Sequence, residues 1–267
     1  MLNKLAIISG STGGIGRVVT ERLWHEGYSI VALGHTLEKC RSLQEWFLDN
    51  PRGQQESNVL SIDLRDDTQL WRISTILTDQ WENYNIPTEL LVTCHGADPF
   101  PAPATISTKT MERIYEIDVL GTYRLCQVVG RMMIAQRRGG CIALVSSLHA
   151  QQTFPERVPY ATSKAAVCGI ARALAVEWGM YGISVNALCP WQVDGPRTNA
   201  FIKQAHEQGV DLLGAYKKRS PMRRLVQPEE IANTVIWLTQ TRSVTGQSIV
   251  IDAGVSASMW HEGYMER

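Results

Sequence analysis

Tyr160 and Lys164 are the two side chains of this chain whose types and spacing most clearly permit chemistry. They lie four residues apart in the segment YATSK, directly after Pro159 and at the start of an alanine-rich run that predicts a helix. Residues at i and i+4 share a helix face, so the phenol and the ammonium can point into one site. A nearby cation favours the phenolate form of a tyrosine. The pair is a candidate acid and base for a carbonyl or an alcohol, although taken alone it is more simply explained as a solvated helix face.

Ser147 is the second candidate. It lies thirteen residues before Tyr160 and, with Ser146, ends the apolar run 141–145, which predicts a buried strand. A hydroxyl at a strand end can donate to the same substrate oxygen that the phenol serves. A serine at a strand end is also an ordinary turn residue, so both roles stay open.

A glycine-rich turn opens the chain. The apolar run 5–8 precedes Gly10, Gly14 and Gly16, and a helical pattern follows that ends near Gly27. Glycines allow the backbone to approach a pyrophosphate, and a helix N-terminus offers free N–H groups and the positive end of a dipole. Such a turn alone is often only a turn, but the order of strand, turn and helix favours a nucleotide site.

Composition excludes several classes of function. The 267 residues include 26 Lys and Arg and 26 Asp and Glu, so the electrostatic case for nucleic acid or an anionic membrane is absent. No apolar run approaches the ~18 residues of a membrane span, and the first strand starts too early for a signal peptide. The six cysteines form no C-x-x-C pair and the six histidines form no H-x-x-x-H pair. We therefore expect reduced thiols, no metal centre and a cytoplasmic protein.

Strand-like and helix-like stretches alternate along the chain. Strands are predicted at 5–8, 29–33, 59–62, 90–93, 141–145, 184–188 and 248–251, and helices at 18–27, 37–48, 68–81, 109–135, 160–180 and 228–238. The alternation predicts an α/β fold, a Rossmann-like doubly wound parallel sheet of about seven strands with helices on both faces and ligands at the strand carboxyl ends. We expect a single domain over 1–267, with a substrate lid near 192–220 and a C-terminal tail at 255–267.

Taken together, these motifs resemble the short-chain dehydrogenase/reductase family, in its compact subclass of about 250 residues. The resemblance extends roughly over residues 3–254. The spacing of the three glycines is one family mark, and the spacing of Ser147, Tyr160 and Lys164 is a second. The segments 185–190 (VNALCP), 224–232 (RLVQPEEIA), 245–247 and 250–254 add further marks in the family's order.

The resemblance implies an oxidoreductase that transfers a hydride between a nicotinamide cofactor and a secondary alcohol or ketone. Ser147 would hold the substrate oxygen, Tyr160 would exchange its proton, and Lys164 would favour the phenolate and bind the nicotinamide ribose. The family positions that bind the cofactor fall on Gly10, Ser11, Thr12, Gly14, Ile15, Gly16, His35, Thr36, Asp63, Leu64, Cys94, His95, Gly96, Tyr160, Lys164, Pro190 and Val193.

The end of the second strand bears on the choice of cofactor. The strand ends in 32–36 (ALGHT) without the acid that would bind the ribose hydroxyls of NAD(H). His35 stands where NADPH-dependent members often carry an arginine, so NADP(H) is favoured and NAD(H) is possible. His35 is also compatible with a loop under the adenine that tolerates either cofactor. Asp63 resembles the family residue that holds the adenine amino group, and it can also cap the next helix.

Four positions depart from the family pattern. Cys94 and His95 replace the asparagines that usually follow the fourth strand, and His95 is either a second titrating group or a packed loop residue. Asp118 replaces an asparagine that helps hold a water of the proton relay. An aspartate can still hold that water, but it also attracts Lys164 and weakens its effect on Tyr160. We include Asp118 among the catalytic residues, with the relay left open. Trp191 replaces a glycine, and it either narrows the cavity or packs under the lid.

The substrate is predicted from the side chains expected around the site. His149, Phe154 and Trp191 are the chosen lining residues, with Phe100, Gln151, Phe201 and the tail 259–264 as further candidates. This mixture suggests a medium-sized, partly apolar or cyclic alcohol or ketone. In the family the helix that here spans 165–178 packs against its copy, so a homodimer or homotetramer is expected. The alternative is a non-catalytic NAD(P)-sensing or scaffold protein, and a dehydratase or epimerase is a third, less favoured possibility.

Overall fold

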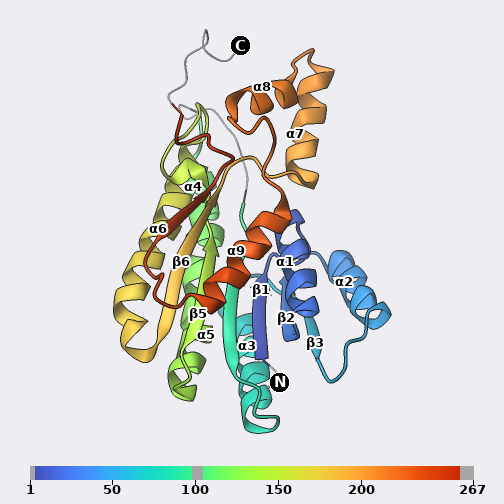
Figure 1. Cartoon of the computed structure of the whole chain (residues 1–267), viewed down its shortest axis with the longest axis vertical. Helices are drawn as coiled ribbons and strands as arrows, with labels where there is room; N and C mark the ends of the chain where they lie inside the picture. Colours follow the sequence, from blue (N-terminus) through green and yellow to red (C-terminus); the bar gives the residue numbers. More distant parts are fainter. Residues whose placement is uncertain (1–3, 98–104, 259–267) are drawn as a thin grey trace.

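A seven-stranded parallel sheet forms the centre of the molecule (Figure 1). The computed structural model describes residues 4–97 and 105–258. Within them the strand order is β3-β2-β1-β4-β5-β6-β7. The strands are β1 (Lys4–Ser9), β2 (Tyr28–Gly34), β3 (Ser57–Ser61), β4 (Thr88–Thr93), β5 (Gly140–Val145), β6 (Ile183–Pro190) and β7 (Ser248–Ile251).

Helices cover both faces of this sheet. They are α1 (Gly14–His25), α2 (Leu37–Asp49), α3 (Asp67–Glu82), α4 (Thr108–Tyr115), α5 (Gly121–Gln136), α6 (Val158–Trp178), α7 (Pro196–Glu207), α8 (Leu212–Arg219) and α9 (Pro228–Gln240). One apolar cluster joins the sheet to α1, α2 and α9, and a second joins it to α3, α5 and α6. The β1 side chains alternate between the two clusters, because successive residues of a strand face opposite sides. The doubly wound parallel sheet predicted from the sequence is confirmed.

The helix predicted over 109–135 occurs as one unbroken helical run, but the run is not α-helical throughout. The structure divides it into α4, a π-helical turn η1 (Glu116–Leu120) and α5. A π turn inserts one extra residue per turn and is frequent at functional sites. Here it contains Asp118, whose side chain is fully buried. The periodicity of the sequence does not reveal this turn, because the apolar pattern continues through it.

The sheet reverses its winding between β1 and β4, which lie side by side although β2 and β3 separate them in sequence. Ligands of doubly wound folds bind at this point, outside the carboxyl ends of the strands. Gly10 follows β1 here with φ +65°, and a Cβ on it would lie 2.7 Å from the carbonyl carbon of Cys94. The glycine therefore allows the two loops to pack directly against each other. Figure 1 shows α7 and α8 above this edge, in the segment where the sequence predicted a lid.

Candidate active site

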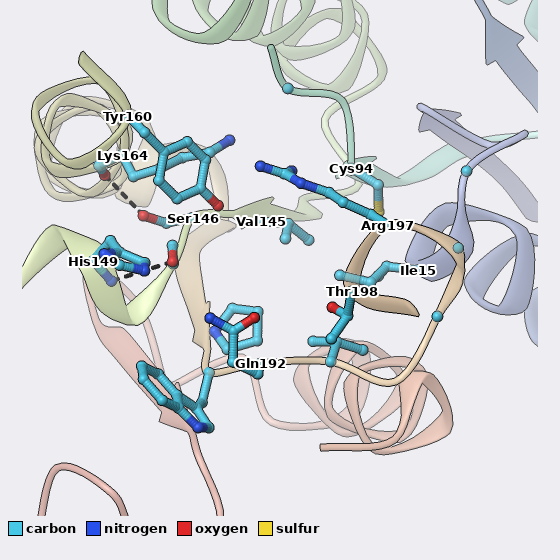
Figure 2. Close-up of a pocket in the computed structure, with 18 of the residues that line it drawn as sticks. Ile15, Cys94, Val145, Ser146, His149, Tyr160, Lys164, Gln192, Arg197 and Thr198 are labelled. Atoms are coloured by element: carbon cyan, nitrogen blue, oxygen red, sulfur yellow. Dashed lines mark hydrogen bonds between the residues drawn. The ribbon is translucent and has the colours of Figure 1, made fainter. Parts of the chain in front are cut away.

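A cavity of about 310 Å³ lies at the carboxyl ends of the central strands (Figure 2). It joins the glycine turn before α1, the end of β5, the start of α6 and the segment that enters α7. Its lining consists of residues 13–16, 94–96, 145–147, 149, 157, 160, 164, 190–198, 201 and 216. The structure thus brings Ser147, Tyr160 and Lys164 to one cavity, together with the glycine turn.

Helix α6 presents Tyr160 and Lys164 on one face, as their spacing requires. Pro159 stands in its first turn, where its fixed φ favours a helix start. Lys164 is only 4% exposed, and its Nζ lies 5.7 Å from the centre of the Tyr160 ring. The phenol and the ammonium are therefore held close together at the wall of the cavity.

Asp118 lies under Lys164, outside the cavity wall. Its Oδ2 is 3.5 Å from Lys164 Nζ and accepts a hydrogen bond from Ser163 Oγ at 3.0 Å. Its Oδ1 accepts from the backbone N–H of Ala97 at 2.6 Å. Both side chains of the ion pair are nearly inaccessible, at 5% and 0% exposure. Asp118 therefore connects the loop after β4 to the face of α6 that carries Lys164. The attraction between Asp118 and Lys164 was expected from the sequence, whereas the contact with Ala97 was not.

Ser147 follows β5 and precedes the short 3-10 helix η2 (Leu148–Ala150). Its Oγ accepts the backbone N–H of His149 at 3.2 Å, which leaves its own proton to donate. The neighbouring Ser146 Oγ donates to the carbonyl oxygen of Lys164 at 2.8 Å and so fastens β5 to α6. Both serines line the cavity, and Ser146 also ties helix α6 to the sheet.

The glycine turn fits a diphosphate. Helix α1 starts at Gly14, no side chain caps it, and its first turn contains no acidic residue. A Cβ on Gly16 would collide with the carbonyl oxygen of Gly10, and a Cβ on Gly14 would lie 3.1 Å from Pro196 Cδ. The glycines therefore let the helix N-terminus pack directly against the preceding turn and Pro196, and no side chain at these positions covers the helix N–H groups that a phosphate could reach.

A second cavity of about 250 Å³ continues the first beyond Gly96, under the ends of β2 and β3. Among its lining residues are His35, Asp63, Leu64, Arg65 and Arg113. Arg65 holds both carboxylate oxygens of Asp63, at 2.9 and 2.6 Å. Hydrogen bonds from Arg65 lower the pKa of Asp63 to about 2. The position and size of this cavity fit the adenosine end of a dinucleotide.

Helix α3 is capped by Asp66, whose side chain accepts from Thr68 N. The sequence had suggested that Asp63 could cap this helix in addition to binding the adenine. The carboxylate of Asp63 instead lies in the second cavity, paired with Arg65.

Both ring nitrogens of His95 form hydrogen bonds with hydroxyl groups. Its Nδ1 lies 2.6 Å from Ser9 Oγ and its Nε2 lies 3.2 Å from Thr122 Oγ1. Burial, together with the charge of Lys164, lowers the pKa of His95 to about 4. The imidazole is therefore neutral near pH 7 and ties the loop after β4 to β1 and α5. The geometry agrees with the packed-loop interpretation.

His149 belongs to an aromatic wall of the cavity. Its ring centre lies 5.3 Å from Phe154, 5.6 Å from Tyr160 and 6.4 Å from Trp191. Its Nδ1 is 2.9 Å from Thr153 Oγ1. Burial and the nearby Arg157 and Arg197 lower its pKa to about 4. The aromatic wall presents flat faces and a neutral imidazole to whatever occupies the cavity.

The predicted site residues divide into those that line the first cavity, those that line the second and those that line neither. Thirteen line the first cavity, among them Pro190, Trp191 and Val193, while Gly10, His35, Asp63 and Leu64 line the second. Ser11, Thr12, Thr36, Asp118 and Phe154 line neither cavity. Ser11 is buried and donates to Leu33 O, and Thr12 lies against Gly34. Thr36 is the N-cap of α2 without a side-chain capping bond.

Some cavity residues had no signal in the sequence. Arg157 precedes α6, and Arg197 and Tyr216 lie on α7 and α8, yet all three line the first cavity. Of the earlier candidates, Phe201 lines the cavity and Gln151 does not. Phe100 and the tail 259–264 lie outside the described residues.

The six cysteines are all free, and all but Cys94 are buried. No group of three or more His, Cys, Asp or Glu suitable for a metal ion occurs in residues 4–97 and 105–258. Over the same ranges, every helix is too short or too polar to cross a bilayer.

Comparisons with known proteins agree over nearly the whole chain. The family model described as enoyl-(acyl carrier protein) reductase matches residues 10–256. D-arabinitol 2-dehydrogenase (ribulose-forming) of Candida tropicalis is 27% identical over 265 residues, which cover 94% of this chain and 92% of the relative. D-threitol dehydrogenase of Mycolicibacterium smegmatis is 26% identical over 262 residues, with 94% and 92% covered.

Solved structures share the fold. A gluconate 5-dehydrogenase from Burkholderia cenocepacia J2315, solved in complex with NADP and tartrate, superposes with a TM-score of 0.84 at 23% identity. The superposition covers 97% of each chain. At this identity the likeness concerns the arrangement of the sheet and its helices.

Proposed function

The chain belongs to the short-chain dehydrogenase/reductase family, whose members are NAD(P)-dependent oxidoreductases of alcohols and ketones, and we propose that it catalyses such a reaction. In this proposal Ser147, Tyr160 and Lys164 are the catalytic residues. The observation that supports this most is the shared cavity. The three side chains open into the same space as an uncapped helix N-terminus built of glycines. Such a space allows a substrate oxygen to meet the phenol while a dinucleotide lies along the strand ends.

Each residue has a distinct task in this proposal. Ser147 donates its hydroxyl proton to the substrate oxygen, because its acceptor side already holds the His149 N–H. Tyr160 takes the proton of the alcohol during oxidation and returns it during reduction, and Lys164 stabilises the phenolate between the two. A bound nicotinamide supplies the hydride chemistry. General acid–base catalysis of this kind contributes about 10²–10⁴-fold.

NADP(H) is the cofactor that we favour, with NAD(H) possible. The second cavity contains His35, Arg65 and Arg113, and its only carboxylate among the described residues, Asp63, is already paired with Arg65. No acid follows β2 to repel a 2′-phosphate. The NADP bound in the gluconate dehydrogenase structure supports the same choice.

The substrate that we propose is a medium-sized secondary alcohol or ketone with a cyclic or partly apolar face. The aromatic wall supports this, because His149 and Trp191 line the cavity, Phe154 packs against both of their rings, and flat rings pack well on the C–H face of such a molecule. The polyol and sugar names of the relatives make hydroxylated compounds the first class to test.

Further features remain proposals of the same kind. We propose one domain in which α7 and α8 act as a lid over the cavity, since Arg197 and Tyr216 reach its lining from these helices. We also propose that α6 packs against a second copy of the chain in a dimer or tetramer. Val176 on this helix and Met180 just after it are apolar but 84% and 82% exposed, which supports such packing. A cytoplasmic location agrees with six free cysteines.

The test combines binding and turnover. Titration with NADPH and NADH, followed by a screen of alcohols and ketones by absorbance at the reduced nicotinamide band, should give turnover with the wild type. Tyr160→Phe should abolish turnover while NADPH binding persists, and Tyr84→Phe, on an exposed tyrosine, serves as the matched control. Full activity of Tyr160→Phe would refute the assignment. Cofactor binding without turnover over a broad panel would favour the sensor or scaffold alternative.

A further inference from the structure

Cationic side chains outnumber carboxylates among the described residues that line the first cavity. Arg157, Arg197 and Lys164 line it, whereas Asp194 is the only carboxylate among its described lining residues. Lys164 is paired with Asp118 beneath the wall.

The first of the two guanidinium groups is that of Arg157. Arg157 is the residue before α6, three positions from Tyr160. It lies close enough to His149 and Tyr216 to lower the pKa of both, against the larger effect of burial on Tyr216. The diphosphate site lies at the opposite wall, at the glycine turn before α1. Arg157 is thus placed beside the aromatic wall.

Arg197 approaches the same region from the lid. Its guanidinium carbon lies 5.3 Å from the centre of the Tyr160 ring. Figure 2 shows the side chain extending across the cavity from α7 toward Tyr160 and Lys164. Arg197 also lowers the pKa of His149. Two cations from separate elements therefore converge on the aromatic wall next to the proposed acid and base.

We propose that the physiological substrate is a small hydroxy acid whose carboxylate is bound by Arg157 and Arg197. This inference rests on the proposed function and names its substrate class. A guanidinium binds a carboxylate through two parallel hydrogen bonds, and the contact strengthens where water is excluded. The cavity, at about 310 Å³, has to hold the nicotinamide and the substrate together, which favours a compact acid over a bulky one.

The reaction is balanced without any further reagent. The carbinol C–H bond breaks and its electron pair leaves as hydride to the oxidised nicotinamide, while the O–H proton passes to Tyr160. The carbinol becomes a carbonyl, and the carboxylate stays unchanged. In the reverse direction a keto acid is reduced to the hydroxy acid.

The experiment compares aldonates of about four to six carbons with the alditols of the same length, a size range chosen for the cavity. Turnover is measured with NADP⁺. Binding of the same compounds is measured by calorimetry on protein saturated with NADPH, where an alcohol cannot react. We expect wild-type protein to prefer the aldonate in both assays. Arg157→Gln should reduce the ratio of aldonate to alditol by about 10- to 100-fold, the range for a lost charged hydrogen bond.

Two further variants sharpen the test. Arg157→Lys keeps the charge but loses the two-pronged geometry, so its ratio should lie between wild type and Arg157→Gln. Arg197→Gln should lower the ratio in the same direction. Arg72→Gln removes the same charge from the exposed face of α3 and should leave the ratio unchanged.

The outcomes separate the two proposals. Equal binding of aldonate and alditol by wild type, or an unchanged ratio in both arginine variants, overturns the carboxylate site even if neutral alcohols are oxidised. Tighter binding of an alditol phosphate than of the aldonate also overturns it. Selective aldonate binding without turnover of any alcohol or acid supports the carboxylate site and refutes the proposed oxidoreductase reaction.

Discussion

Replacing Asp118 by alanine should destabilise the protein by several kcal/mol. The carboxylate is fully buried and has three partners, namely the N–H of Ala97, the hydroxyl of Ser163 and the ammonium of Lys164. Alanine leaves the ammonium, whose side chain is 5% exposed, without its counterion. Removing one partner of a buried ion pair costs about 3–5 kcal/mol, because the remaining charge stays out of water.

Asparagine at the same position separates charge from hydrogen bonding. Its oxygen can still accept from Ala97 N–H, and its amide can donate to Ser163 Oγ, whose hydroxyl can turn to the carbonyl of Tyr160, 2.9 Å away. Only the ion pair with Lys164 is lost. We expect Asp118→Asn to cost about 1.5–3 kcal/mol, the range for a single bond to a charged group.

Urea unfolding followed by tryptophan fluorescence, without cofactor and at one protein concentration, measures these losses. A loss of 3–5 kcal/mol corresponds to a melting temperature lower by about 6–20 °C, at about 2–4 °C per kcal/mol for a chain of this size. Asp79→Ala, on the exposed side of α3, should change the free energy of unfolding by about 0.5 kcal/mol or less. An Asp118→Ala variant within about 1 kcal/mol of wild type would contradict the reasoning, since it would mean that the pair with Lys164 is solvated.

Three further predictions concern the same site. Because burial lowers the pKa of His95 to about 4, the unfolded chain binds a proton below about pH 6.5 that the folded protein does not bind until about pH 4. The free energy of unfolding should therefore decrease as the pH is lowered from about 6.5 to about 4. His95→Asn should make this decrease smaller by about 3 kcal/mol in unfolding titrations, and an unchanged pH dependence would show that His95 is not neutral in the folded protein. Gly16→Ala should abolish NADPH binding in calorimetry, because its Cβ collides with Gly10 O, and retained affinity would exclude this turn as the diphosphate site. His35→Asp should weaken NADPH binding at least about tenfold relative to NADH, since a carboxylate there faces the 2′-phosphate, and an unchanged ratio of dissociation constants would place the phosphate elsewhere.

Much of the fold was predictable because it depends on local pattern. The strand over 248–251 and the helix that starts at Leu37 occur where the alternation of apolar and polar stretches placed them. The side chains of Tyr160 and Lys164 share a face because i and i+4 do so in any helix. The glycine turn before α1 was recognisable because a strand and a helix flank it at short range.

Other parts of the site depend on which distant segments the crossovers bring together. His95 lies between Ser9 and Thr122, and Asp118, on the π turn, lies 3.5 Å from Lys164 of another helix. The cations Arg157 and Arg197 meet at one cavity although forty residues and a strand separate them.

The sequence by itself determined most of the helices and strands and the placing of Tyr160 and Lys164 on one helix face, since each depends on contacts within a few residues. Only the tertiary structure decided the charge of the cavity and the burial of His95 and Asp118. Charge and burial depend on the distances between all nearby groups and on the exclusion of water, and those exist only once the sheet and its helices have packed.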